Sequence, residues 1–529
     1  YVKTLPNVVY AAENKYTCSA DTQESIKKMI KEHKLNRVVV ASCTPRTHEA
    51  LFQSTIKEAG LNPFLFEMAN IRDQCSWIHM HEPEKATEKA KDLTRMAVAK
   101  ARYLEPLTKS KLGVNHSAVV VGGGLAGMTA ALDIAAQGFK VDILEATGAM
   151  GGNMVNLYTA EGGISPRQYI KVLEAKVRAN GKITVHLNTK VEDVSGFVGN
   201  FKVKVTGGKE IETGAIVIAT GAKAYVPTEY NYGKDKKVVT QNELEKALAE
   251  GKFAARNVVM VQCVGSRNDA APYCSRVCCS KAVKNAIEIK KRDPKAQVYI
   301  LHKDIRTYGF RETLYKEASG LGVKFIRYPE NKMPEMTADG KIVVEDTILG
   351  APVQLSPDCL VLSVGVRPNE DNEELAKMCK VPLSKDKYFL EAHMKLRPVD
   401  FATSGVYLAG LAHWPKFIDE TIAQASGAAS RAMTIISKQY LETQGIIAAV
   451  NEMVCNGCGV CEPVCEYRAI TIVGDPANPD KRKAVINEGL CMGCGTCVAA
   501  CPSGALEQKG FKNNQILAQI DAALVGGGK

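Results

Sequence analysis

The 529-residue sequence predicts an α/β protein, and three observations support this fold class. An apolar run at residue 117 enters a glycine-rich turn and begins a βαβ pattern, and a second such pattern begins at residue 257. Residues 1–104 alternate strand-like and helix-like segments in a smaller unit. Eight cysteines fall between Cys455 and Cys501, in a spacing that is typical of metal ligands. Patterns and length together indicate three or four domains.

The composition excludes several protein classes. With 46% hydrophobic and 24% charged residues, the chain is not disordered, collagenous or a coiled coil. Lys and Arg exceed Asp and Glu only mildly, 68 against 57, so we expect no nucleic-acid binding. The longest uncharged stretch, Ser117–Leu132, is too short for a membrane span and contains four glycines. Because the clustered thiols must stay reduced, we expect a soluble cytoplasmic protein without a secretory signal.

The first 110 residues predict a small α/β domain. Its elements are a strand at Val8–Tyr10, a helix at Thr22–His33 with Asp21 as N-cap, a buried strand at Arg37–Ser42 and a long helix at Pro83–Leu104. A polar linker, Lys109–Asn115, follows them.

The middle of the chain predicts two βαβ units that are flanked by β-rich segments. The first unit has strands at 118–122 and 140–145 around a helix at Leu125–Gln137, followed by strands at 202–205 and 216–219. The second has strands at 258–262 and Val298–His302 around a helix at Ser280–Lys291, and the apolar strand Cys359–Gly365 closes it. A short strand at Gly405–Ala409 and a helix at Asp419–Lys438 precede the cysteine-rich module, and a helix with a loose tail ends the chain. We expect domains at 1–110, 231–380 and 446–510, one further domain formed by two parts at 116–230 and 381–445, and a tail at 511–529.

The C-terminal module contains a doubled cysteine motif, Cys-x2-Cys-x2-Cys-x3-Cys, which is the run of a two-cluster bacterial ferredoxin. Three thiolates wrap one face of a [4Fe–4S] cluster, and the fourth reaches the other cluster. The first cysteine set is therefore Cys455, Cys458, Cys461 and Cys501, and the second is Cys491, Cys494, Cys497 and Cys465. Glu466 stands where ferredoxins usually carry Pro. A zinc ribbon or disulfides would not need this spacing.

A dinucleotide-binding turn follows the first predicted strand. Gly122, Gly124 and Gly127 form a GxGxxG motif with Leu125 and Ala126 at the helix start, and Glu145 ends the second strand, where it can bind a ribose hydroxyl. The helix N-terminus faces the pyrophosphate. A glycine-rich turn without a ligand is the alternative.

Three further segments resemble the FAD domain of thioredoxin-reductase-like flavoproteins. They are Gly151-Gly152-Asn153, Ala219-Thr220-Gly221 and the GVYLAG segment that ends at Gly410. The resemblance implies FAD in a two-dinucleotide-binding flavoprotein fold. Leu411 stands where that family usually has the Asp that binds the ribityl chain, so the exact ribityl contact stays open. Lys416 is placed to approach the isoalloxazine and stabilise an anionic reduced flavin, and the alternative is a surface lysine.

The second βαβ unit lacks a glycine fingerprint and carries cysteines instead. Cys263 ends its first strand, and Cys274, Cys278 and Cys279 follow in PYCSRVCC. Cys274 and Cys278 would share a helical face if the helix began there, whereas Cys279 would need a bent turn. Four cysteines in 17 residues suit a third [4Fe–4S] cluster, with a structural zinc or a redox pair as alternatives.

Together, GGGLAGMTAAL, CVGSR, PYCSRVCC and the C-terminal module resemble the A subunit of heterodisulfide reductase across the whole chain. No CxxCxxC run interrupts the flavoprotein half, so the chain resembles a short form without an inserted ferredoxin domain. The family implies that Cys18, Cys43 and Cys75 ligate another cluster, with a fourth ligand from a segment before Tyr1. From the residues alone they would be buried free thiols. Cys359 and Cys379 are expected to be structural.

The resemblance implies an oxidoreductase of the methanogenesis type, although the host pathway stays open. Its flavin would bifurcate electrons between low-potential ferredoxin and a higher-potential disulfide. Implied partners are the B and C subunits of heterodisulfide reductase, ferredoxin and a hydrogenase or formate dehydrogenase module, in a dimer of heteromeric units. The alternatives are an NAD(P)H:ferredoxin oxidoreductase, which the missing second glycine fingerprint argues against, and a non-bifurcating electron relay.

Overall fold

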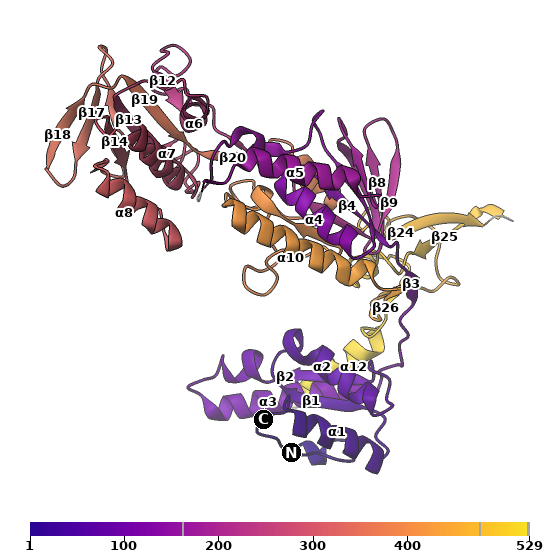
Figure 1. Ribbon diagram of the computed structural model, residues 1–529. Helices are drawn as coiled ribbons and strands as arrows, with labels where there is room; N and C mark the ends of the chain where they lie inside the picture. Colours follow the sequence, from indigo (N-terminus) through magenta and orange to yellow (C-terminus); the bar gives the residue numbers. More distant parts are fainter. Residues whose placement is uncertain (161–162, 476–477, 526–529) are drawn as a thin grey trace. The chain divides into compact units, whose positions relative to one another are not determined.

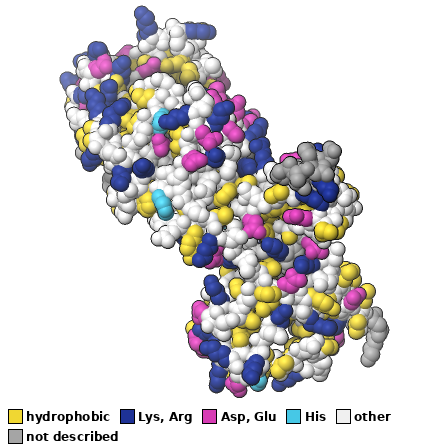
Figure 2. All heavy atoms as spheres, turned by 90° about the vertical axis from the view of Figure 1, so that its right-hand side faces the viewer, with side chains coloured by type: hydrophobic (Ala, Val, Ile, Leu, Met, Phe, Trp, Pro, Cys, Tyr) yellow, Lys and Arg dark blue, Asp and Glu magenta, His cyan; other side chains and the backbone are white. Residues whose placement is uncertain are grey.

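The computed structural model describes residues 1–160, 163–475 and 478–525. The chain divides into two units, of which one combines Tyr1–Leu112 with Glu442–Lys529 and the other comprises Gly113–Leu441 (Figure 1). None of the helices in the described ranges is long and apolar enough to cross a membrane. On the face drawn in Figure 2, basic and acidic side chains are interspersed.

The unit Gly113–Leu441 contains two parallel five-stranded sheets, in the orders β21-β10-β4-β5-β6 and β12-β19-β13-β14-β15. We call the halves around them the first lobe and the second lobe. Apolar runs such as Ser117–Val121 and Asn257–Val264 form the central strands because both faces of each sheet are covered. The two lobes are joined by β11 and β20, which pair antiparallel.

The first lobe packs α4 and α10 side by side against its sheet (Figure 1). Its core joins alanine-rich α4 and α10 to the sheet residues, so small side chains let the helices approach closely. Its elements are β4 (Ser117–Val121), α4 (Leu125–Ala136), β5 (Lys140–Leu144), α5 (Pro166–Ala179), β6 (Ile183–His186), β7 (Val191–Phe197), β8 (Asn200–Val205), β9 (Glu210–Thr213), β10 (Ala215–Ile218), α9 (Asn372–Cys379), β21 (Val406–Leu408) and α10 (Ile418–Ile436).

The second lobe repeats the arrangement with α6, α7 and α8. A capping box, in which the Thr240 hydroxyl accepts from the Glu243 backbone and the Glu243 carboxylate accepts from the Thr240 backbone, starts α6. The lobe and its connectors comprise β11 (Ala222–Ala224), β12 (Val238–Thr240), α6 (Gln241–Ala249), β13 (Asn257–Val264), α7 (Cys278–Arg292), β14 (Gln297–His302), α8 (Glu312–Gly320), β15 (Lys324–Arg327), β16 (Glu335–Met336), β17 (Ile342–Asp346), β18 (Ala351–Leu355), β19 (Cys359–Val364) and β20 (Val366–Pro368).

The other unit contains the N-terminal α/β domain and the cysteine-rich module. Strands β1 and β2 pair in parallel, and the C-terminal helix α12 packs on α3. Its elements are α1 (Ala20–Glu32), β1 (Val38–Ser42), α2 (Pro45–Glu58), β2 (Phe66–Asn70), α3 (Pro83–Ala101), β23 (Ala448–Val450), β24 (Ile470–Asp475), β25 (Asn478–Ile486), α11 (Thr496–Ala500), β26 (Leu506–Gln508) and α12 (Asn513–Leu524). Strands β3 (Lys111–Gly113) and β22 (Tyr440–Glu442) lie where the chain passes between the units.

Most predicted elements are confirmed to within a few residues, and two N-terminal predictions are wrong. Val8–Tyr10 is not a strand, because Val9 is 73% exposed and Tyr10 instead stacks on His33 with ring centroids 5.0 Å apart. Helix α1 begins after Ser19, so Asp21 lies within the first turn rather than at the N-cap.

Candidate functional site

The predicted dinucleotide residues line one large cavity of about 1090 Å³ in the unit Gly113–Leu441. Both lobes contribute walls to it. The predicted residues among its lining are Gly122, Gly124, Leu125, Ala126, Glu145, Gly152, Asn153, Ala219, Thr220, Gly221, Lys416 and Cys278. Gly127, Gly151 and Gly410 lie beside it as backbone that shapes the turns.

Close backbone packing explains the glycines of the first turn. A Cβ at Gly127 would lie 1.8 Å from the Gly122 carbonyl oxygen, and one at Gly122 would lie 2.3 Å from the Ala219 carbonyl oxygen. Gly122 also has a φ of +114°, which favours glycine. Gly124 caps α4 without a side-chain acceptor, so the first amides of the helix are available to a ligand anion.

Two polar groups on the cavity wall fit a dinucleotide. The Glu145 carboxylate accepts from the Gly123 amide at 2.8 Å and from the Thr147 amide at 2.9 Å, which holds it at the end of β5. The buried Thr220 hydroxyl lines the cavity and has no hydrogen-bond partner among the described residues. A bound ligand would satisfy it, since buried polar groups are normally paired. The residues present therefore fit a flavin dinucleotide.

Lys416 lines this cavity, so the alternative of a surface lysine is wrong. Its Nζ donates to the carbonyl oxygens of Gly410 at 2.7 Å and Trp414 at 2.8 Å. Burial, followed by the nearby charge of Arg276, lowers the pKa of Lys416 to about 7. The ammonium can therefore lose its proton close to neutral pH.

The four cysteines of the second βαβ unit lie close together beside that cavity. Burial and the Cys279 and Cys274 thiols raise the pKa of Cys263 to about 12. The pKa of Cys278 also rises well above its usual value, through its hydrogen bond with Cys279 and through burial. Helix α7 begins at Cys278, so Cys274 precedes the helix and the two do not share a helical face.

Sequence reasoning missed Arg276, which lies between these cysteines with a φ of +60°. Its guanidinium donates to the Pro415 carbonyl oxygen at 3.0 Å and to Glu420 at 2.6 Å. The only sequence feature that could have indicated Arg276 is its position within the cysteine motif PYCSRVCC. The contacts tie the cysteine turn to the segment that carries Lys416.

Glu245 was also missed, because nothing in the sequence of α6 marks it. It is 2% exposed, lines the cavity and accepts from the amides of Tyr158 and Thr159, both at 2.8 Å. It also forms ion pairs with Lys281 at 2.8 Å and Lys284 at 3.1 Å. Burial opposes the charged form, but the two lysines outweigh it, so the pKa of Glu245 lies below its ordinary value. Glu245 thus links the second lobe to a loop of the first.

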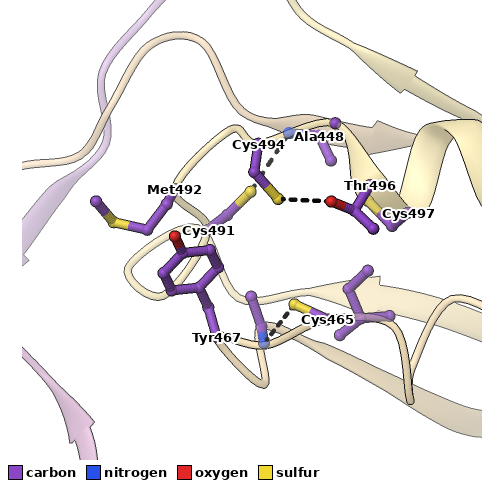
Figure 3. Close-up of a pocket in the computed structure, with 11 residues that line it drawn as sticks. Ala448, Cys465, Tyr467, Cys491, Met492, Cys494, Thr496 and Cys497 are labelled. Carbon is purple, nitrogen blue, oxygen red and sulfur yellow. Dashed lines mark hydrogen bonds between the residues drawn. The ribbon is translucent and has the colours of Figure 1, made fainter. Parts of the chain in front are cut away.

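In the C-terminal module the spatial neighbours match the two cysteine sets. Burial and the thiols of Cys458, Cys455 and Cys501 raise the pKa of Cys461. Burial and the thiols of Cys491, Cys465 and Cys494 raise the pKa of Cys497 to about 11. Figure 3 shows the sulfur atoms of Cys465, Cys491 and Cys494 turned toward one pocket, which Tyr467 and Met492 also line. The crossed exchange of Cys465 and Cys501 is what two cuboidal clusters require.

The N-terminal cysteines are less closely grouped. Cys43 follows β1 and its Sγ lies 3.1 Å from His48 Nδ1, while Cys75 lies in the turn after the neighbouring β2 and donates to the Ala86 carbonyl oxygen at 3.0 Å. Parallel pairing of Ser42 with Asn70 places both turns at one sheet edge. Cys18 is exposed ahead of α1.

Across the described ranges, no three His, Cys, Asp or Glu side chains lie close enough to hold a single metal ion. Cys359 and Cys379 are buried, and burial raises the pKa of each to about 12. The structural role expected for both stays a prediction.

Comparisons with known proteins match the two cofactor regions separately. Residues 116–432 match the family model "Pyridine nucleotide-disulphide oxidoreductase", and residues 454–505 match "4Fe-4S dicluster domain". Among solved structures, the thioredoxin reductase of Lactococcus lactis is 20% identical with a TM-score of 0.43, and the match covers 61% of this chain and 99% of that one. The two family matches identify the chain as an oxidoreductase with flavin-binding and iron–sulfur regions.

Relatives that match nearly the whole chain complete the comparison. The A subunit of the H(2):CoB-CoM heterodisulfide,ferredoxin reductase of Methanothermobacter thermautotrophicus is 40% identical over 628 aligned positions, covering 99% of this chain and 94% of the relative. The iron-sulfur A subunit of the CoB–CoM heterodisulfide reductase of Methanocaldococcus jannaschii is 35% identical, covering 99% and 95%. The first alignment is at least 99 positions longer than this chain, so the relative contains residues without a counterpart here. The chain is therefore a short-form member of the family of heterodisulfide reductase A subunits.

Proposed function

We propose that this chain is the FAD- and iron–sulfur-containing subunit of a heterodisulfide reductase-type complex, and that its flavin bifurcates electrons. One branch would lead to low-potential ferredoxin and the other to a higher-potential disulfide on partner subunits. The name of the Methanothermobacter relative combines hydrogen, the CoB–CoM heterodisulfide and ferredoxin.

One arrangement supports the proposal most directly. Cys278 and the dinucleotide turn at Gly122 line the same cavity, so a one-electron carrier beside Cys278 would be a neighbour of the flavin. FAD, when bound, accepts two electrons and releases them singly. In a pyridine-nucleotide enzyme the same position would carry a glycine turn for a second dinucleotide. Here the cysteine turn PYCSRVCC occupies it.

The chain's own residues would prepare the flavin site in three ways. Glu145 would hold the ribose, and the amides at the start of α4 would bind the pyrophosphate. Thr220 would donate or accept a hydrogen bond from the buried wall. Lys416 would hold a proton at its Nζ beside the isoalloxazine and release it near neutral pH.

We further propose four [4Fe–4S] clusters. Two would occupy the C-terminal sets, one the site of Cys263, Cys274, Cys278 and Cys279, and one the site of Cys18, Cys43 and Cys75. The partners would be the B and C subunits, ferredoxin and a hydrogenase or formate dehydrogenase module. The assembly would be a cytoplasmic dimer of heteromeric units.

The first experiment measures iron, sulfide and flavin in the anaerobically purified chain. About 12 to 16 Fe with one FAD per chain supports the proposal, since each cluster contributes about four. About 8 Fe would mean that only the C-terminal sets are loaded, and would favour zinc or a dithiol at Cys263–Cys279. Bleaching of the flavin by NADH would favour an NAD(P)H:ferredoxin oxidoreductase instead.

A second experiment separates bifurcation from a simple relay. The purified complex should reduce ferredoxin only while the disulfide branch also turns over. Ferredoxin reduction that proceeds without the disulfide would leave the chain as a non-bifurcating relay.

A further inference from the structure

The two halves of the C-terminal module repeat each other at an offset of 36 residues, which is the separation of Cys455 from Cys491. Strand β25, before the second cysteine run, corresponds to the segment before the first run. Under this offset Arg482-Lys483-Ala484 corresponds to Ile446-Ile447-Ala448. The structure follows the repeat closely: a Cβ at Gly457 would lie 2.1 Å from the Arg482 carbonyl oxygen, and one at Gly493 would lie 2.2 Å from that of Ile446.

One backbone hydrogen bond to sulfur is repeated in both sets, and the second set has a further one, from the Ala469 amide to Cys465 Sγ at 3.3 Å. The Ala484 amide donates to Cys455 Sγ at 3.5 Å, and the Ala448 amide donates to Cys491 Sγ at the same distance. Each set also has one hydroxyl contact, of Ser503 with Cys501 at 3.6 Å and of Thr496 with Cys494 at 3.5 Å. Hydrogen bonds to sulfur raise cluster potentials, so the repeated bond raises both alike, and the Ala469 bond acts on the second set.

Charge is not matched. Lys483 Nζ donates to the Cys455 carbonyl oxygen at 2.8 Å and also to the Glu452 carbonyl oxygen, so an ammonium is held against the loop of the first cysteine set. The corresponding residue beside the second set is Ile447, which is 2% exposed and uncharged. The module is therefore symmetric in its backbone and asymmetric in its electrostatics.

Glu466 adds to this difference in charge, because it places a negative charge beside the second cysteine set. At the offset of 36 it corresponds to Pro502, so only one half of the module carries this carboxylate. Glu466 directly follows Cys465, which belongs to the second set. Glu466 thus adds negative charge near the second set.

We infer that Lys483 sets the order of the two cluster potentials, so that a cluster on Cys455, Cys458, Cys461 and Cys501 has the higher potential. A cluster gains one negative charge when it gains one electron, and a nearby cation stabilises that state. A single electron in the module would then leave the second cluster, which is oxidised by one electron, and reduce the first by one electron, without proton transfer. This inference rests on the cluster occupancy proposed above.

The test is an EPR-monitored redox titration of the two C-terminal clusters in the anaerobically purified chain, with dithionite as the reductant. The variants are Lys483→Gln, which removes the charge, and Lys483→Arg, which keeps it. Lys481→Gln is the matched control, because Lys481 is an exposed residue of the same strand. Iron content is measured first for every variant. The iron content of the wild-type chain shows whether the C-terminal clusters are present. It therefore tests the proposed function separately from the effect of Lys483 on the cluster potentials.

Lys483→Gln should lower the higher of the two midpoints by about 59 mV, which is a tenfold change for a one-electron couple. Lys483→Arg and Lys481→Gln should leave it in place. Glu466→Gln should raise the lower midpoint, which provides a reading independent of Lys483. The inference is overturned if Lys483→Gln moves the lower midpoint, if it moves neither, or if Lys481→Gln shifts the titration equally.

Discussion

The Arg276 guanidinium lies 2.6 Å from the Glu420 carboxylate, and this contact joins the cysteine turn of the second lobe to the start of α10 in the first. A second pair, Arg311 with Asp419 at 2.9 Å, acts on the same helix start. Both acidic residues follow shortly after Lys416 in the chain. The position of the proposed cluster relative to the flavin cavity is thus fixed by side chains as well as by the β11–β20 connector.

Lys416 should make the flavin potential depend on pH near neutrality. Its pKa is lowered from 10.5 to about 7, chiefly by burial, so the ammonium prevails below that pH and the neutral amine above it. The cation would stabilise an anionic reduced flavin, and this stabilisation would be lost as the pH rises through about 7. Lys416→Met should remove the bend in the plot of flavin midpoint potential against pH. Lys223→Met, an exposed residue of the same cavity, should retain it.

Arg276→Gln should shift the bend in the plot of flavin midpoint potential against pH to a higher pH. The positive charge of Arg276 is the second cause, after burial, of the lowered pKa of Lys416, so its removal raises the pKa toward the ordinary value. The same titration measures the effect. Arg292→Gln is the control, because Arg292 pairs with Glu288 within α7, at 2.7 Å. An unmoved bend in Arg276→Gln would show that the charge of Arg276 does not reach Lys416.

The sequence was informative where local chemistry determines the structure. The glycine turn at Gly122 and the crossed exchange of Cys465 and Cys501 follow from steric and ligand rules that operate over short distances. The roles of Arg276 and Glu245 could not be predicted, because their partners lie far away in sequence and meet only when the two lobes pack. Val8–Tyr10 shows the opposite failure: an apolar triplet resembles a strand, but no strand among the residues that the structure describes pairs with it.

Gly127→Ala should abolish flavin binding while a matched glycine substitution does not. A methyl group at Gly127 would lie 1.8 Å from the Gly122 carbonyl oxygen, which forces α4 away from the dinucleotide turn. Gly320→Ala is the control, because Gly320 ends helix α8 and a Cβ there meets nothing within 4 Å. The ratio of FAD to protein, measured from absorbance, should fall severalfold only in the first variant. Equal flavin content in both would contradict the close helix–strand contact.

Glu245→Gln should destabilise the unit Gly113–Leu441. The substitution leaves the Lys281 ammonium buried without its carboxylate, and breaking a buried pair in this way costs about 3–5 kcal/mol. Replacing Glu245, Lys281 and Lys284 together by Met should recover part of that loss, since both cations are then removed with the carboxylate. Urea unfolding measures the difference. The exposed pair of Glu250 and Lys252 supplies the control, Glu250→Gln, which should leave the midpoint unchanged.

Cys278→Ser should remove about four Fe per chain, the content of one cluster. The residue is buried among the thiols of Cys279, Cys263 and Cys274, so its loss opens the ligand set rather than a surface position. Cys379→Ser, which is equally buried but stands apart in α9, should keep the full iron content. Iron loss in both variants would indicate general destabilisation. Iron loss in neither would favour the alternative that the four cysteines form a redox pair rather than a cluster site. With the flavin content unchanged, a loss confined to Cys278→Ser would assign the missing cluster to the turn that replaces the second dinucleotide site.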